Sequence, residues 1–181
     1  MKKPGLRDFR KYLKNLEEDD LREELEKLYK QLPIVKEYYQ FELSANHDSI
    51  VKSYKTKIDR HYFPTSGRKP KRPKAAKMRD LINQFKQLSP FAFDTVDLLL
   101  HQVETMIKFA KDRGYVSKGF NQTLISRYKE ALVILTKEEL QADFSDRGQQ
   151  IMQQSRFMRR WGTYDSLVEL YIEYINKGKK L

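Results

Sequence analysis

The residues with the most evident capacity for chemistry are basic ones, gathered in a short stretch in the middle of the chain. They are Arg68, Lys69, Lys71, Arg72, Lys74, Lys77 and Arg79, with no acidic residue between them. The chain has a formal net charge of +11, and most of that excess falls between residues 55 and 79. Lysines and arginines on an extended segment can neutralise successive phosphates and release their counterions. The pattern therefore predicts that these seven residues contact nucleic acid or another polyanion.

The same stretch also fits a solvated linker that binds nothing. Pro64, Pro70 and Pro73 fall within ten residues, which forbids a helix and favours extended backbone. The charges of such a linker would serve mainly to keep the protein soluble. In that case the protein is a helical protein–protein adaptor of unknown partner, which is our alternative hypothesis. No recognition-helix motif stands out, so base-specific reading of a duplex is not expected.

A second candidate for chemistry is the group Asp97, His101 and Glu104. The spacings of four and three residues place them on one face of a helix, and such spacing occurs among metal ligands. A polar stripe beside an apolar one produces the same pattern, and this is the interpretation we adopt. The chain has no cysteine, no glycine-rich phosphate loop and no catalytic signature. We therefore expect no metal, no cofactor and no catalysis, and a metal-dependent enzyme at His101 is the third hypothesis.

The single tryptophan of the chain, Trp161, has basic and aromatic neighbours. With Arg159, Arg160 and Tyr164 it could form a stacking platform for a base or a partner. A Trp-Gly pair before a capped helix is also typical of a helix corner packed into the core. We favour the second interpretation, in which Trp161 is a core residue.

The elements that must position these residues are helices, because apolar side chains recur every three or four residues in nearly every segment. Such sets include Leu6, Phe9, Leu13 and Leu16; Leu21, Leu25, Leu28 and Leu32; Met78, Leu81, Ile82 and Phe85; and Phe120, Leu124, Tyr128 and Leu132. Pro33 is expected to open one helix, and Gly114 to end the longest one. The pattern predicts an all-α protein of eight to ten packed helices, arranged as helical hairpins with one extended basic loop.

Two local signals in the C-terminal half predict where helices begin and break. Thr136 and Glu139 have the spacing of a capping box, in which a hydroxyl accepts from the backbone and a carboxylate returns the bond. We expect a helix to start there. Glycine destabilises a helix interior, so a bend or break is expected around Gly148.

The prolines of the basic stretch divide the chain into two parts. We expect an N-terminal helical part, 1–63, a basic proline-rich linker, 64–73, and a C-terminal helical part, 74–181, which together could form one composite domain. The most apolar stretch, 96–110, is interrupted by polar residues and too short to cross a bilayer. No secretory signal is visible at the start of the sequence. We therefore expect a cytoplasmic protein that does not enter a membrane.

Several segments also resemble a known family. They are residues 6–16, 33–39 and 160–174, and the most specific positions are Trp161, Gly162, Tyr164, Asp165, Leu167, Tyr171 and Tyr174. In these segments the chain resembles an uncharacterised family of small bacterial helical proteins, a domain of unknown function. Glu17 departs from the family pattern, which usually has a small hydroxyl residue there as a helix cap. The resemblance implies a bacterial, intracellular, all-helical protein and implies no activity.

Overall fold

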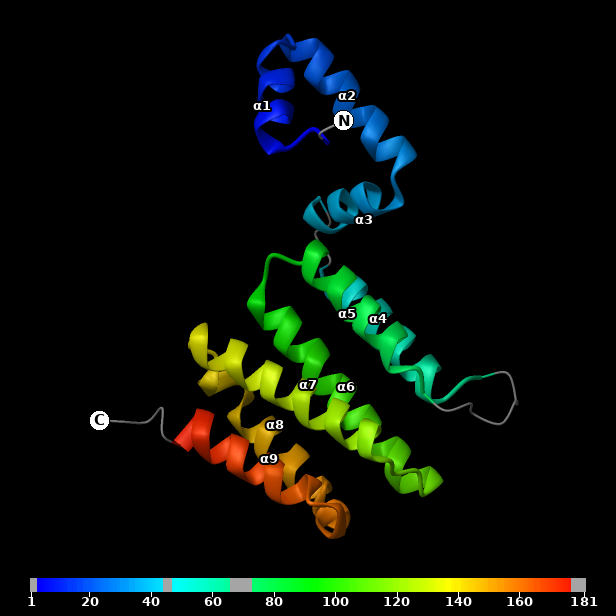
Figure 1. Ribbon diagram of the computed structural model, residues 1–181, viewed down its shortest axis with the longest axis vertical. Coiled ribbons are helices and arrows are strands. Elements are labelled where there is room, and N and C mark those ends of the chain that lie inside the picture. The colour runs from blue at the N-terminus through cyan, green and yellow to red at the C-terminus, as the bar shows by residue number, and fades with distance from the viewer. Residues whose placement is uncertain (1–2, 44–46, 66–72, 177–181) are drawn as a thin grey trace. The chain divides into compact units, whose positions relative to one another are not determined.

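The computed structural model describes residues 3–43, 47–65 and 73–176, and within these residues it contains helices and no strand (Figure 1). The α-helices are α1 (Leu6–Lys14), α2 (Glu18–Gln31), α3 (Pro33–Glu42), α4 (His47–Tyr62), α5 (Ala75–Leu88), α6 (Ala92–Arg113), α7 (Lys118–Lys137), α8 (Gln141–Gln154) and α9 (Thr163–Tyr171). A 3-10 helix, η1 (Arg156–Trp161), precedes α9, and a π-helical turn, η2 (Ile172–Asn176), follows it. The predicted all-α fold of eight to ten helices is confirmed.

The chain forms two compact units, Met1–Ala45 and Asn46–Leu181. The boundary between the units along the chain differs from the expected linker, 64–73. Helices α4 and α5, on either side of that linker, both belong to the second unit. Most of the linker lies outside the described residues. The two helices lie side by side (Figure 1), and the ring of Tyr54 meets that of Phe85 edge to face at 5.0 Å. Aromatic contacts of this kind stabilise helix pairs beyond the area they bury.

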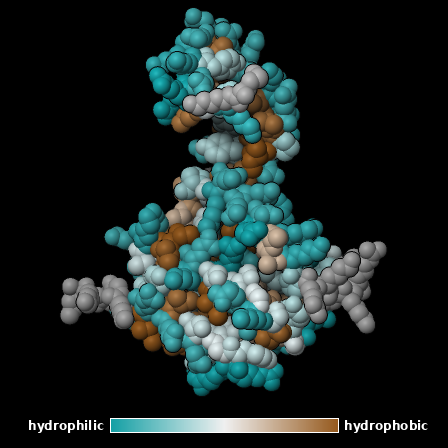
Figure 2. Space-filling model, viewed as in Figure 1, coloured by the Kyte–Doolittle hydropathy of each residue, from teal (hydrophilic) through white to brown (hydrophobic). Residues whose placement is uncertain are grey.

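The first unit, α1 to α3, buries few of its apolar side chains. No residue of α1 or α2 is buried, and α3 buries only Phe41. Its exposed large hydrophobic residues are Leu6, Phe9, Tyr12, Leu25, Leu32, Ile34, Tyr38 and Leu43. Figure 2 shows brown, hydrophobic surface among hydrophilic residues on this unit. Pro33 is the first residue of α3, as predicted, where its fixed φ and missing N–H are compatible with a helix.

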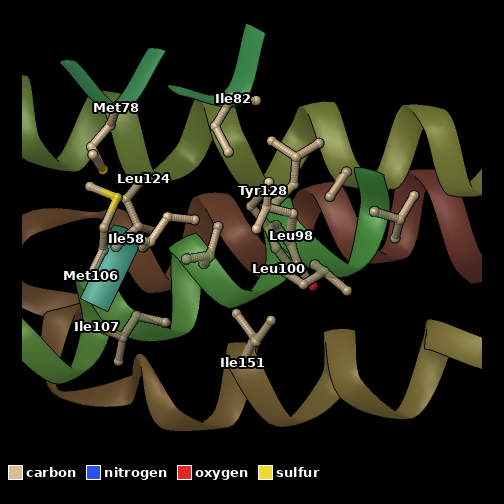
Figure 3. Close-up of a cluster of buried hydrophobic side chains, with 14 of the residues drawn as sticks. Ile58, Met78, Ile82, Leu98, Leu100, Met106, Ile107, Leu124, Tyr128 and Ile151 are labelled. Carbon is tan, nitrogen blue, oxygen red and sulfur yellow. The ribbon is translucent and has the colours of Figure 1, made fainter. Parts of the chain in front are cut away.

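The second unit is built around α6, which packs against α4, α5, α7 and α8. Figure 3 shows Leu98, Leu100, Met106 and Ile107 of this helix among buried side chains from the surrounding helices. A helix that is apolar on nearly every face must lie inside a bundle. The helix ends at Gly114, which has a left-handed φ of 59°, as predicted for a C-terminal glycine.

The predicted start of a helix at Thr136 is wrong. Helix α7 continues to Lys137, and the chain turns at Glu139, whose φ is 57°. The Thr136 hydroxyl instead donates to the carbonyl of Tyr174, at 3.2 Å. The hydroxyl therefore donates to a distant carbonyl and does not cap a helix.

The predicted break at Gly148 is also wrong, because α8 is continuous from Gln141 to Gln154. A Cβ at Gly148 would lie 3.2 Å from the ring of Tyr171 and 3.4 Å from the hydroxyl of Tyr128. That hydroxyl donates to the Gly148 carbonyl at 2.9 Å. The glycine is thus a point of close helix packing, and the resulting contacts offset its low helix propensity.

Candidate functional site

Three of the seven predicted site residues lie within the described part of the chain. Lys74 precedes α5 as its N-cap, with extended backbone, and Lys77 and Arg79 lie in the first turns of that helix. All three are exposed, and none forms a salt bridge with another described residue. The first N–H groups of a helix lack carbonyl partners and carry partial positive charge. The other four predicted residues, Arg68, Lys69, Lys71 and Arg72, lie outside the described residues.

A histidine on α4 fixes the start of this basic helix. The backbone N–H of Lys74 donates to Nε2 of His61 at 3.0 Å. Burial, and then the positive charges of Lys77 and Lys74, lower the pKa of His61 below its usual value. The neutral imidazole can accept the hydrogen bond, whereas a protonated ring could not. The conformation at the N-terminus of α5 therefore depends on a neutral His61.

A hollow of about 390 Å³ lies between the N-terminal halves of α5 and α7. Its lining residues are Ala75, Ala76, Arg79, Gly119, Gln122, Thr123, Ser126 and Arg127. Two of them are arginines and none is acidic. Arg127 forms an ion pair with Glu130 at 2.5 Å, and Lys86 also pairs with Glu130, so Arg79 is the unneutralised cation of the hollow.

A second hollow, of about 320 Å³, lies at the N-terminus of α7 and shares Gln122 with the first. Its lining residues are Val116, Ser117, Lys118, Asn121, Gln122, Ile125 and Trp161. Again none is acidic, and Lys118 adds a third lining cation. Ser117 caps α7 by accepting from the N–H of Phe120 at 3.3 Å. This cap fixes the backbone beside the hollow. We call the two hollows, together with Lys74 and Lys77, the α5–α7 surface.

Trp161 does not have the core position that we favoured. Its exposed fraction is 39%, and the guanidinium carbon of Arg160 lies 3.8 Å from its ring centroid. Arg159 lies similarly over Tyr164, at 4.7 Å. Gly162 does turn the chain, with a φ of 71°, so the helix corner exists. The corner leaves Trp161 partly exposed, in the lining of the second hollow.

The polar stripe on α6 forms ion pairs with its neighbouring helices. Arg147 of α8 donates to both carboxylate oxygens of Glu104, at 2.7 and 2.8 Å, and to Asp97. Asp97 also pairs with Lys55 of α4, at 2.6 Å. His101 instead bonds Asp59 of α4, at 2.8 Å. Asp97 and Glu104 therefore share Arg147, whereas His101 has a different partner. The described residues contain no group of three His, Cys, Asp or Glu side chains that could hold a metal.

The ion pairs of Asp97 favour its charged form. Burial would raise the pKa of Asp97, but hydrogen bonds from Lys55 and Arg147 outweigh it and hold that pKa below its usual value. A hollow of about 750 Å³ adjoins the stripe. Its lining includes the acids Asp59, Glu104 and Asp112 and the bases Lys108 and Lys111. Its mixed charges distinguish it from the α5–α7 surface and make it a poor site for a polyanion.

Sequence reasoning missed Lys118, Asn121 and Arg127, which lie on α7. No charge run or motif marks them. Packing of helices places Arg127 in one hollow with Arg79, and Lys118 and Asn121 in the adjoining hollow. The one available signal was Ser117, a favourable N-cap residue followed directly by a lysine.

Comparison with known proteins assigns the chain to a family. A model described as a family of unknown function (DUF6155) matches residues 4–174. The chain belongs to this family. The resemblance identified from the segments around Leu6 and Trp161 is thus confirmed as to the family. No curated protein and no solved structure matches this DUF6155 chain, and none of its described helices has the length and apolar character needed to span a membrane.

Proposed function

We propose that this member of DUF6155 is a non-catalytic binding module that contacts nucleic acid, or another polyanion, through the α5–α7 surface and the basic segment preceding it. The observation that carries the proposal is the set of exposed, unneutralised cations Lys74, Lys77 and Arg79 at the start of a 14-residue helix. They continue the run of Arg68, Lys69, Lys71 and Arg72 in the sequence. The absence of acidic side chains from the lining of both neighbouring hollows supports the same choice.

The mechanism is phosphate neutralisation. Each lysine or arginine that pairs with a phosphate releases condensed counterions, so the affinity falls as the salt concentration rises. The first N–H groups of α5 add donors and partial positive charge for one phosphate. Such contacts fix the position of a backbone without reading its sequence. The module would therefore bind many sequences with similar affinity.

A charge-matched comparison tests this proposal. Lys74, Lys77 and Arg79 are changed together to Gln, and a control variant changes three exposed lysines outside both hollows, Lys52, Lys111 and Lys129. Both variants lose three charges, so general electrostatic attraction falls equally. Binding of a random-sequence oligonucleotide is measured by fluorescence anisotropy at several salt concentrations. In the variant that lacks Lys74, Lys77 and Arg79, the slope of log K against log salt should become shallower by about two to three units. In the control variant the slope should change by less than about one unit. Equal changes in the two variants would contradict the assignment of the site.

A second candidate function is the adaptor, which the first unit favours. Large apolar side chains such as Phe9, Tyr12 and Leu25 are exposed there, and contiguous exposed apolar residues often mark protein–protein contacts. Recovery of one protein partner from nuclease-treated extract of the native cell, lost on Phe9→Asp, would support it. Both functions are compatible with a protein of the bacterial cytoplasm, which remains part of the proposal.

A further inference from the structure

The hollow at the N-terminus of α7 has features that suit a flat, aromatic ligand. Its volume of about 320 Å³ falls at the lower end of the ~300–1,000 Å³ range of small-molecule pockets. Its lining residues include the aromatic Trp161 and the amide residues Asn121 and Gln122. Aromatic and amide groups together are the usual means of holding a nucleobase, by stacking on its face and by hydrogen bonds to its edge.

We infer that this hollow holds an unpaired nucleobase, so that the protein binds single-stranded nucleic acid through a base as well as through phosphates. The inference rests on the proposed function, which supplies the phosphate contacts. A base inside a duplex is stacked and paired, and its face is not available to a side chain. The ligand class is therefore a single strand, and a duplex should be bound only through its backbone.

The first support is the environment of Trp161. Its exposed fraction of 39% is high for a residue type that usually contributes its large area to a core. The guanidinium of Arg160 covers the ring at 3.8 Å and is not among the residues that line the hollow. Trp161 is therefore a partly exposed aromatic residue in the lining of the hollow, with an arginine stacked on its ring. Stacking of this kind tolerates any base, because every base has a π face.

The second support is an unsatisfied amide. Asn121 lines the hollow with only 8% of its surface exposed, and its Oδ1 has no hydrogen-bond partner. Buried polar atoms are nearly always paired, so one that is unpaired requires an explanation. Asparagine can bond two positions on the edge of a base at once. The oxygen itself has almost no exposed surface, so a base in the hollow would become its partner once the Asn121 side chain rotates toward it.

The third support is continuity with the phosphate-binding residues. Gln122 belongs to both hollows, so the base site adjoins the hollow that contains Arg79. Lys118 lies in the base site itself and can pair with the phosphate beside the bound nucleotide. A strand lying along the N-terminal half of α7 would thus place one base at Trp161 and successive phosphates toward α5.

Because Trp161 is the only tryptophan, its intrinsic fluorescence reports on this hollow alone. The probes are a 12-nucleotide single strand, an abasic strand of equal length and charge, and a 12-base-pair duplex. We expect the single strand to quench the fluorescence saturably, and the abasic strand and duplex to bind without comparable quenching. Binding is also measured with labelled strands. The protein should bind the single strand that carries bases roughly tenfold or more tightly than the abasic strand, since stacking of one base contributes about that factor.

Variants separate stacking from folding. Trp161→Ala should weaken single-strand binding roughly tenfold and leave abasic binding unchanged, whereas Trp161→Phe should restore most of the loss. Asn121→Leu removes the amide but fills the same space with no unpaired atom. It should weaken binding of the single strand that carries bases and leave binding of the abasic strand unchanged. Equal affinity for the two strands without quenching would overturn the base site and leave the phosphate-binding function intact. If neither strand binds at low salt, both proposals fail.

Discussion

Arg147 of α8 forms ion pairs with two acids of α6, Glu104 and Asp97, and its removal should measurably destabilise the protein. Arg147→Met keeps the aliphatic length of the side chain and deletes the hydrogen bonds to Glu104 and Asp97. Asp97 retains Lys55 as a partner, so the main loss falls on Glu104. The exposed fractions of the three side chains are 24% for Arg147, 18% for Asp97 and 30% for Glu104, so partial rehydration is possible.

The size of the effect follows from these environments. Leaving a buried charge unpaired costs ~3–5 kcal/mol, whereas breaking an exposed pair costs less than ~1 kcal/mol. The intermediate exposure of Glu104 gives a loss of about 2 kcal/mol in the free energy of unfolding. For a chain of this length that loss corresponds to a Tm lower by roughly 4–8 °C. Arg147→Met with Glu104→Gln should recover part of the loss, because the second change removes the uncompensated charge.

Urea unfolding followed by circular dichroism at pH 7 measures the loss. The matched control is Arg156→Met, an exposed arginine on η1, for which we expect less than ~0.5 kcal/mol. The pKa of Asp97 is lowered in the folded protein, so its stabilisation is present above the unfolded pKa and is lost as the pH falls through the folded value. The difference between wild type and Arg147→Met should therefore shrink below about pH 4. Equal losses for Arg147→Met and Arg156→Met would refute this account of the stripe.

Two further predictions concern the positions of α5 and α8. The pKa of His61 is lowered in the folded protein, so the unfolded chain binds more protons as the pH falls below ~6.5. Wild type should lose more stability than His61→Gln between pH 7.5 and pH 5.5 in urea unfolding, and parallel pH dependences would contradict the role of this histidine. Tyr128→Phe removes the buried hydrogen bond to Gly148 and should cost about 1 kcal/mol in the same assay. An unchanged unfolding midpoint would show that this bond does not hold α8.

The helices could be predicted from the sequence because their boundaries depend on local signals. Pro33 and Gly114 lie at the predicted ends of helices, since proline and glycine restrict or permit backbone angles wherever they occur. Thr136 and Gly148 misled the prediction for the opposite reason. The partner of each comes from a distant helix, and local pattern contains no information about such contacts.

Of the candidate site, only the run of basic residues could be predicted from the sequence. Lys74, Lys77 and Arg79 form part of a run visible in the sequence, and they remain exposed in the folded protein. The hollows require α7 beside α5 and η1 beside α7, which is a property of packing. Trp161 was predicted to be a core residue because the large side chain of tryptophan usually packs in a protein core. Its 39% exposure depends on the turn at Gly162 and could not be inferred from residue type.

The salt dependence of binding is the most direct test of the central claim that the basic segment and the α5–α7 surface bind a phosphate backbone. For five to seven phosphate contacts the slope of log K against log salt should be about −4 to −6. Changing Arg68, Lys69, Lys71 and Arg72 together to Gln should weaken binding similarly for all sequences and shallow the slope by roughly three to four units. If wild type binds neither duplex, single strand nor heparin at low salt, or if the quadruple variant keeps the wild-type slope, the phosphate-binding function is refuted and the adaptor becomes the leading proposal.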